Sequence, residues 1–433
     1  MKPPHRAPED SGESLLAHVA QQLAPAFLGE RRPHFVVALS GGLDSMVLLN
    51  VMAQLRSRLN FSLAALHINH GIHPDAIHWE DACRDQCQLL SIPFEAEHAT
   101  LELHAGSLEM KAREARYALF GRALKAGDWL LQAHHLNDQA ETILFRLLRG
   151  QGTAGLAGIP RQRPLGAATL LRPLLSVGRE ALLDVAKAWQ LCWVEDPSND
   201  CLAHDRNFLR HAIFPLLRER FPSVLERIAQ SGEWMRQSLD VLQDWESSWL
   251  DSRMSVVRGQ HCLALDDLIG LEDVPRRSLL KAWLERLGFG TGESLLIEAS
   301  RQCFQSGAES SPELLLRGAV LRRYRNCLYA IPESHYSLAT QDWPASGWSW
   351  EGSEPLHLRD GRCLRLPSHI PVQDGPFSVR RRQGGERLDA PGDAHRRDLK
   401  IVFQRLGIPP WERDCIPLLF QGDRLIALIL DYS

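Results

Sequence analysis

Residues 36–49, VVALSGGLDSMVLL, constrain the fold of this chain more than any other segment. An apolar run stops at two glycines and a second apolar run follows, which predicts a buried strand, a tight turn and a helix. Glycines allow positive φ and a close approach of the backbone to a ligand. The amides that open a helix point toward an anion. We therefore predict a phosphate-binding loop made of Ser40, Gly41, Gly42, Leu43, Asp44 and Ser45.

The loop is not a Walker A sequence, because the lysine that GxxxxGK[ST] requires is missing. It carries Asp44 instead, and a carboxylate beside bound phosphate usually implies a bridging Mg²⁺. The alternative is a plain turn in which Asp44 only caps the following helix. The complete six-residue string directly after an apolar strand favours the phosphate site.

Strands and helices alternate through the first half of the chain. Strand patterns lie at 34–39, 61–69 and 128–135, with helical patterns between them at 44–55, 79–92 and 107–124. This order predicts an α/β fold with a doubly wound parallel sheet, in which ligands bind beyond the carboxyl ends of the strands. We place domain boundaries at 1–217, 218–340 and 356–433. The middle domain is predicted to be helical and the last to be small and α+β, after a linker rich in Pro, Gly and Ser.

Two motifs add polar side chains near the predicted sheet edge. HINHG places His67 at the end of a strand, where it is more suited to a base or ribose than to a metal site. KAREARY places Lys111 and Arg113 early in a helix. A phosphate contact and a solvated basic face are equally consistent with that second motif.

HHLNDQAET, at 134–142, is more specific. On one continuous helix, His134, Asp138 and either Glu141 or Thr142 would share a face. A carboxylate one turn after a histidine at a strand–helix junction suits Mg²⁺ or a nucleotide. Further along, RNFLR begins with Arg206, and arginines at that density supply bidentate phosphate contacts.

Cysteines and tryptophans fit structural roles better than chemical ones. Cys83 and Cys87 are expected to be two small buried side chains, since no second cysteine pair would complete a zinc site. Trp234, Trp245 and Trp249 follow helical spacing, for which core packing is a better interpretation than base stacking.

The charge is unevenly distributed. The chain has a net charge of −4, yet residues 379–405 hold eight Lys and Arg against four Asp and Glu. This asymmetry indicates a module that binds a polyanion. No apolar run is long enough to span a membrane, and the polar start MKPPHRAPEDSGES lacks the core of a signal peptide. We expect a cytoplasmic protein without a membrane partner.

In order along the chain, SGGLDS, HINHG, KAREARY, HHLNDQAET, LLRGQGTAGLAGI and EDPSN…RNFLR resemble the tRNA(Ile)-lysidine synthetases, members of the PP-loop ATP pyrophosphatases. The resemblance runs from Val36 to about Leu217 and resumes at RRRQGGERL and VFQRLGIPPWERDCIPLL. It implies an adenine-nucleotide α-hydrolase-like catalytic domain that binds ATP, followed by two tRNA-binding domains. The oligomeric state stays open, with a homodimer as one option.

The resemblance implies that free L-lysine is ligated to C2 of the wobble cytidine in the isoleucine tRNA with anticodon CAU. The cytidine O2 attacks the α-phosphate of ATP and pyrophosphate leaves. The ε-amine of lysine then displaces AMP from C2. The product, lysidine, pairs with A instead of G and changes the identity of the tRNA from methionine to isoleucine.

Residue roles follow from the same resemblance. The 40–45 loop and His67 would bind ATP. Asp44 and Asp138 would hold Mg²⁺ or orient and deprotonate the amine, which is cationic at neutral pH because amine pKa values lie near about 10.4. Lys111 and Arg206 would stabilise charge on the phosphoryl group. The predicted tRNA contacts are Arg113, Arg380, Arg381, Arg382 and Arg387.

Two alternatives differ in chemistry. A PP-loop tRNA thiolase needs a reactive cysteine or an iron–sulfur cluster. Only Cys83 and Cys87 are predicted near the catalytic half, on a helix face remote from the loop. A non-catalytic RNA-binding protein would not need the intact loop together with Asp138 and Arg206.

Overall fold

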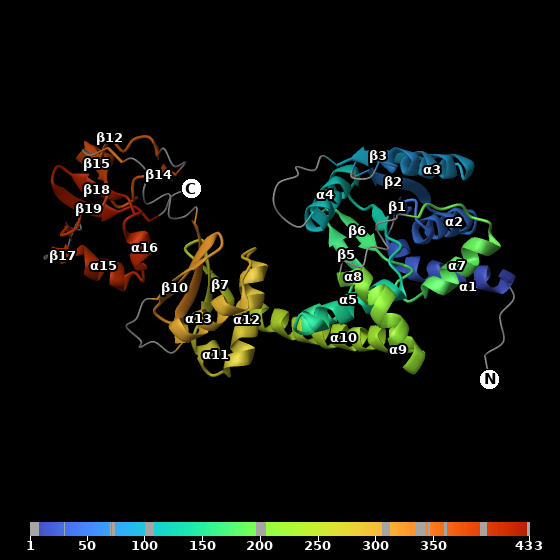
Figure 1. Cartoon of the computed structure of the whole chain (residues 1–433). Helices are drawn as coiled ribbons and strands as arrows, with labels where there is room; N and C mark the ends of the chain where they lie inside the picture. The colour runs from blue at the N-terminus through green and yellow to red at the C-terminus, as the bar shows by residue number, and fades with distance from the viewer. Residues whose placement is uncertain are drawn as a thin grey trace. The chain divides into compact units, whose positions relative to one another are not determined.

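The computed structural model describes residues 8–29, 31–69, 71, 74–99, 108–195, 205–304, 312–333, 343–344, 347–358, 362–389 and 396–430, except for the side chains of 8–10 and 108–113. The chain divides into two compact units between Leu242 and Gln243 (Figure 1). The domain boundaries placed from the sequence stay a prediction.

The first unit is built on a six-stranded sheet in the order β3-β2-β1-β4-β6-β5. Neighbouring strands are parallel except for β5, which pairs with β6 in the antiparallel sense. The strands are β1 (His34–Ala38), β2 (Ser62–Asn69), β3 (Phe94–His98), β4 (Trp129–Leu131), β5 (Gln162–Leu165) and β6 (Ala168–Leu171). The order reverses at β1, so the loop after β1 lies where ligands bind in such sheets.

Helices cover both faces of this sheet, which confirms the doubly wound prediction. Alternate residues of β1 enter two cores: Phe35 and Val37 pack with α1 (Pro8–Leu23), α2 (Leu43–Arg58) and α7 (Arg179–Ala188). Val36 instead packs with Phe120 of α4 (Leu108–Ala123) and with Leu130. The period-two alternation of a strand therefore builds both layers. The helices α3 (Ala76–Leu89) and α5 (Leu136–Leu148) complete the alternation, and a 3-10 turn, η1 (Ala24–Leu28), follows α1.

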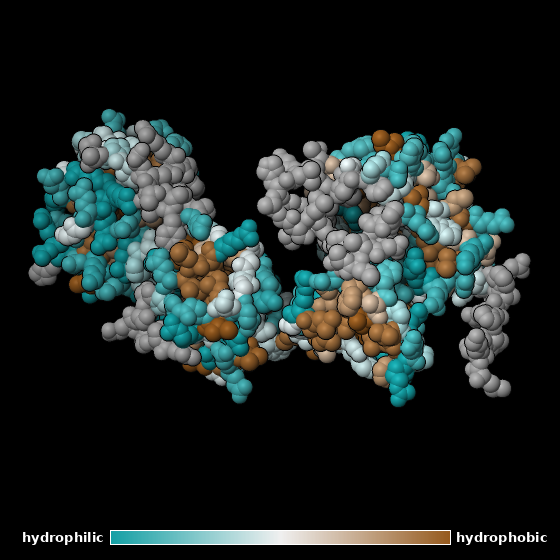
Figure 2. All heavy atoms as spheres, viewed as in Figure 1, coloured by the Kyte–Doolittle hydropathy of each residue, from teal (hydrophilic) through white to brown (hydrophobic). Residues whose placement is uncertain are grey.

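After β6 and α7 the first unit becomes helical. Its remaining elements are α6 (Thr153–Leu156), α8 (Asp205–Phe208), the π-helical turn η3 (Leu209–Ile213), α9 (Phe214–Arg220) and the start of α10 (Val224–Asp251). The core prediction for two of the α10 tryptophans is wrong. Trp234 is 59% exposed and Trp245 is 42% exposed, whereas Trp249 packs on a core. Figure 2 shows apolar side chains gathered on the visible face over α5 and α10.

The second unit holds two further sheets. The helical pattern predicted for the middle of the chain is present in α10, α11 (Asp266–Ile269), α12 (Asp273–Arg286) and α13 (Glu293–Phe304). These accompany an antiparallel sheet, β7-β8-β11-β10-β9, that periodicity did not reveal. Its strands are β7 (Met254–Val257), β8 (Gln260–Ala264), β9 (Glu313–Leu316), β10 (Ala319–Tyr324) and β11 (Cys327–Pro332).

The last sheet has the order β12-β15-β18-β19-β16-β17. The strands are β12 (Trp348–Trp350), β15 (Phe377–Arg380), β16 (Arg387–Leu388), β17 (Arg397–Asp398), β18 (Leu418–Gln421) and β19 (Arg424–Leu428). Beside it lie the pair β13 (Leu356–His357) and β14 (Cys363–Leu364), the 3-10 turn η4 (Val372–Asp374), α15 (Leu399–Arg405) and α16 (Pro410–Arg413). This α+β arrangement agrees with the prediction for the C-terminal segment.

The two sheets of the second unit are joined through α16. The Trp411 ring meets the rings of Tyr329 and Tyr324 at centroid distances of 5.4 and 6.0 Å. Its Nε1 donates to Oε1 of Gln260 over 3.1 Å, and this bond is buried. These contacts dock the last sheet on the antiparallel sheet before it.

None of the helices in the described ranges combines the length and the apolar character that crossing a bilayer requires.

Candidate active site

The predicted phosphate loop connects β1 to α2, and its shape requires glycine. Gly41 has φ of +87°, a conformation that L side chains rarely adopt. A Cβ there would lie 3.2 Å from Sγ of Cys83 and 3.7 Å from the carbonyl oxygen of Trp79. The placement of Cys83 remote from the loop was therefore wrong, since this buried cysteine packs beneath it. From the other side, the Val194 amide donates to the Gly41 carbonyl over 2.9 Å.

The start of α2 is left without a side-chain cap. Gly42 is the N-cap residue and no side chain bonds the first amides. The interpretation of Asp44 as a cap is thus wrong. The two serines hold the turn instead: Ser45 Oγ donates to the Gly42 carbonyl over 2.9 Å and lies 3.1 Å from Ser40 Oγ. Amides in a first turn without a capping side chain, with hydroxyls beside them, can bind phosphate oxygens.

The second part of the site begins where β4 passes into α5. The helix starts at Leu136, and His135 is its N-cap in a reciprocal capping box with Asp138. His134 therefore lies outside the helix, and its predicted place on one helix face with Asp138 and Glu141 is wrong, whereas Asp138 and Glu141 do share a face and their arginine partners. The His134 ring accepts a bond at Nδ1 from Nε of the buried Arg172, over 3.2 Å.

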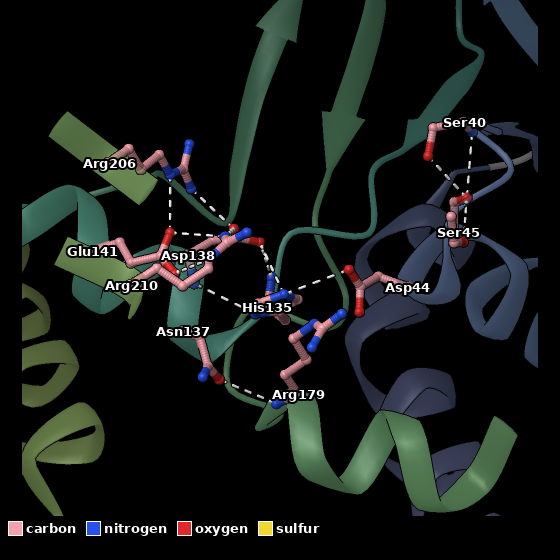
Figure 3. Close-up of polar contacts among 11 residues, drawn as sticks. Ser40, Asp44, Ser45, His135, Asn137, Asp138, Glu141, Arg179, Arg206 and Arg210 are labelled. Atoms are coloured by element: carbon pink, nitrogen blue, oxygen red, sulfur yellow. Dashed lines mark hydrogen bonds and ion pairs between the residues drawn. The ribbon is translucent and has the colours of Figure 1, made fainter. Parts of the chain in front are cut away.

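His135 brings the two predicted acids together, as Figure 3 shows. Its Nε2 lies 3.5 Å from Oδ2 of Asp44 and 3.5 Å from Oδ2 of Asp138. Its Nδ1 accepts the backbone amide of Asp138 over 3.4 Å, so the Nε2 atom carries the proton that faces the carboxylates. The His135 ring is buried and therefore held in one position. Its contacts with both carboxylates place Asp138 close to Asp44 of the loop.

Two arginines close the site. Arg206 donates from Nη2 to Oδ1 of Asp138 and from Nε to Oε2 of Glu141, both over 2.9 Å. Arg210 donates from Nε to Oε1 of Glu141 over 2.7 Å and from Nη2 to Asp138 over 3.4 Å. The helical spacing predicted Glu141 on the same face as Asp138, but the sequence assigned a role neither to Glu141 nor to Arg210. Their spacing from Asp138 and Arg206, three and four positions on a helix, was the available signal.

The charges in this network shift the protonation of its members. Burial acts to raise the pKa of Asp138, but His135 and Arg206 together lower it below its usual value. Burial acts to lower the pKa of His135, but Asp44, Asp138 and Glu141 raise it above its usual value. Asp138 is therefore held as a carboxylate, and the neighbouring carboxylates make the His135 ring easier to protonate than a free imidazole.

Three family models match the chain, as a PP-loop domain over residues 15–217, a TilS substrate binding domain over 263–329 and a TilS substrate C-terminal domain over 377–430. A relative from Alkalilimnicola ehrlichii is 38% identical over 431 residues, covering 97% of this chain and 93% of the relative. The chain belongs to the tRNA(Ile)-lysidine synthase family. Relatives from Xanthomonas axonopodis pv. citri and Coxiella burnetii are 37% and 36% identical, covering 90% and 92% of this chain and 88% of each relative. All three carry the name tRNA(Ile)-lysidine synthase, so the resemblance seen in the motifs is confirmed.

Three further predicted site residues of this tRNA(Ile)-lysidine synthase family member are outside the acid–arginine cluster: His67 lies under the loop, and the side chains of Lys111 and Arg113 are outside the described residues. His67 is buried, and its Nδ1 lies 2.8 Å from the carbonyl oxygen of Leu39, just before the loop. Burial lowers the pKa of His67, so its ring is neutral. The side chains of Lys111 and Arg113 lie outside the described residues, although their backbone belongs to α4.

Four of the five predicted tRNA-binding arginines, all except Arg113, lie at or next to the strands of the last sheet. Arg380 and Arg381 line a cavity of about 550 Å³, together with Gln383, Gly384, Gly385, Glu386 and Phe420. The guanidinium of Arg380 lies over the Phe420 ring. Arg382 is paired with Asp414 over 3.2 Å, and Arg387 is exposed.

We expect the stabilising effect of His135 to weaken as pH rises. Because the folded pKa lies above the usual 6.5, its ion pairs are fully present below pH 6.5 and are lost as pH rises through the folded value. His135→Asn keeps a favourable cap residue and removes the titrating ring. The gap in melting temperature between wild type and variant should therefore be larger at acidic than at alkaline pH. A gap that stays constant across that range would contradict the ion-pair assignment.

Proposed function

We propose that this chain ligates free lysine to C2 of the wobble cytidine in the CAU-anticodon isoleucine tRNA, converting ATP to AMP and pyrophosphate. The observation that carries the proposal is the near full-length match to the tRNA(Ile)-lysidine synthase family, with matches to two substrate-binding domain models. The uncapped loop at the switch point of the sheet supports ATP binding. A tRNA substrate also supports a cytoplasmic location.

Asp44 fits a divalent cation better than Asp138 does. Its Oδ1 is buried and has no hydrogen-bond partner among the described residues, a condition that a bound cation would relieve. Both oxygens of Asp138 already accept bonds, Oδ1 from Arg206 and Oδ2 from the His135 amide. Mg²⁺ bound at Asp44 would neutralise phosphate charge beside the loop.

Asp138 suits the lysine step as a fixed negative charge. Its lowered pKa makes it a weak proton acceptor and keeps it ionised, so we assign it to attracting and orienting the ammonium group of lysine. Arg206 uses Nε and Nη2 for carboxylates and is 41% exposed. Its remaining donors can reach a phosphoryl oxygen, which supports its assignment to charge stabilisation in the adenylation step.

A thiolase is the weaker candidate. Burial raises the pKa of both Cys83 and Cys87 to about 12, which leaves them without the thiolate that sulfur transfer needs. Cys192 is a further cysteine of the catalytic half, and it is exposed. Cys192→Ser should therefore leave product formation unchanged if the activity is lysine ligation.

The test is incorporation of labelled lysine into a CAU-anticodon isoleucine tRNA transcript, with and without ATP. We expect ATP-dependent label that resists acid and deacylation, because the lysine is bonded to the base. A transcript with uridine at the wobble position is the matched control and should stay unlabelled. Pyrophosphate release without lysine incorporation would reject the proposal.

We expect the last sheet to contribute to tRNA affinity and to take no part in the catalytic steps. The side chains of Arg381 and Arg387 have no hydrogen-bond or ion-pair partner within the described ranges, so they can contact backbone phosphates. We expect Arg381→Gln plus Arg387→Gln to weaken tRNA binding and to reduce the slope of log Kd against log salt by about 2. Arg31→Gln plus Arg122→Gln, two exposed arginines of the first unit, is the charge-matched control. Filter binding at several KCl concentrations measures the Kd of tRNA and its salt slope for each double variant. Equal slopes for the two double variants would contradict the assignment of Arg381 and Arg387 to phosphate contacts.

A further inference from the structure

Arg179 is a cation at the site that neither the motifs nor the family matches assign. It is the first residue of α7, and its side chain is exposed. Figure 3 shows its guanidinium rising from the helix start toward the space between His135 and Asp44. Within the described residues, no carboxylate or carbonyl oxygen bonds this guanidinium.

The backbone of Arg179 is held in place by the site itself. Its amide donates to Oδ1 of Asn137, in the first turn of α5, over 3.1 Å. Two residues earlier, the Val177 carbonyl accepts the Leu136 amide over 2.9 Å. The body of α7 packs against α2 in the main core. The start of α7 is thus fixed relative to both the phosphate loop and the acid cluster.

The ion pairs of the cluster do not use Arg179. The carboxylates of Asp138 and Glu141 are paired with the guanidinium groups of Arg206 and Arg210, and Asp44 lies against the His135 ring. Arg179 is therefore a further cation at the mouth of the site. A cation beside a phosphate loop attracts an anion.

We propose that Arg179 binds the phosphate groups of ATP, from the side of the site opposite the 40–45 loop, and holds the departing pyrophosphate. This inference rests on the proposed function, because it takes ATP as the substrate. The shared chemistry is a phosphate anion, and the tRNA backbone is the other source of it. A guanidinium can bind two phosphate oxygens at once, which a lysine ammonium cannot do in a fixed plane.

The test compares Arg179→Gln and Arg179→Lys with wild type and with Arg31→Gln. Arg31 is an exposed arginine before β1, at the opposite edge of the sheet from the loop. Calorimetric titration measures the Kd of ATP and of pyrophosphate without tRNA, filter binding measures the Kd of tRNA, and labelled lysine gives KM for ATP and for lysine. Melting temperatures confirm that each variant folds.

We expect Arg179→Gln to raise the Kd of ATP and of pyrophosphate at least about tenfold, the range for a lost charge-assisted bond. Arg179→Lys should fall between it and wild type, and Arg31→Gln should match wild type. The Kd of tRNA and the KM of lysine should stay within about twofold. Unchanged ATP and pyrophosphate affinity, or weakened tRNA binding in their place, would overturn the proposal. Absence of lysidine in the wild type would reject the proposed function instead, and would leave the nucleotide titrations to be judged on their own.

Discussion

Asp138→Asn is expected to lower kcat/KM for lysidine formation on the order of 10³-fold, within the range for loss of a group that stabilises charge at a reaction centre. The variant removes the negative charge that faces His135, Arg206 and Arg210. Asparagine keeps an oxygen that can accept the His135 amide, so the start of α5 should persist. Labelled lysine incorporation measures the loss.

The control for Asp138→Asn is Asp184→Asn, an exposed acid on α7 whose loss changes the net charge by the same amount. It should retain wild-type activity. The Kd of tRNA should be unchanged in both variants, because the predicted tRNA contacts lie mainly on the last sheet. Activity of Asp138→Asn within about threefold of wild type would contradict a direct role.

Asp44→Asn is expected to reduce pyrophosphate release on the order of 10²-fold, the loss typical of removing one electrostatic partner of a transition state. Its buried Oδ1 has no partner among the described residues, and a cation that arrives with the nucleotide would supply one. We expect ATP with Mg²⁺ to raise the melting temperature of the wild type but not of this variant.

The variant without ligand should melt close to the wild type, because the loss of a poorly satisfied carboxylate offsets the loss of its contact with His135. Asp184→Asn serves again as the charge-matched control. If ATP and Mg²⁺ stabilise Asp44→Asn as well as wild type, then Asp44 does not hold the cation. Loss of tRNA binding in this variant would contradict the division of labour between the sheets.

The sequence predicted those parts of the structure that depend on local pattern. The apolar run before Ser40 and the alternation of strands with helices were enough for the doubly wound sheet and the position of the loop. The resemblance then selected Asp44, Asp138 and Arg206, which the structure brings together around His135.

The positions of residues that are determined by tertiary contacts could not be predicted from local sequence pattern. Cys83 forms the floor beneath Gly41 although the two are far apart in the chain. His134 was predicted to lie on the helix, but it lies two positions before the first residue of α5, because the capping box places that start at Leu136. Trp234 has helical spacing but no layer above it to bury it. The strands β7–β11 are four to six residues long, too short for their alternation to be seen beside the longer helices.

The docking of Trp411 bears on how the second unit folds. An ion pair between Arg258 and Glu412, with Nε and Oε2 2.6 Å apart, supports the same contact. The two substrate-domain matches therefore describe stretches of sequence that are joined by one buried aromatic cluster. A polyanion that binds the last sheet stabilises its partner sheet as well, because a ligand lowers the free energy of every segment that unfolds with its site. The two sheets of the second unit would then unfold together in one cooperative step. Each sheet expressed without the other would be less stable than in the whole chain, because it would lose the Trp411 contact.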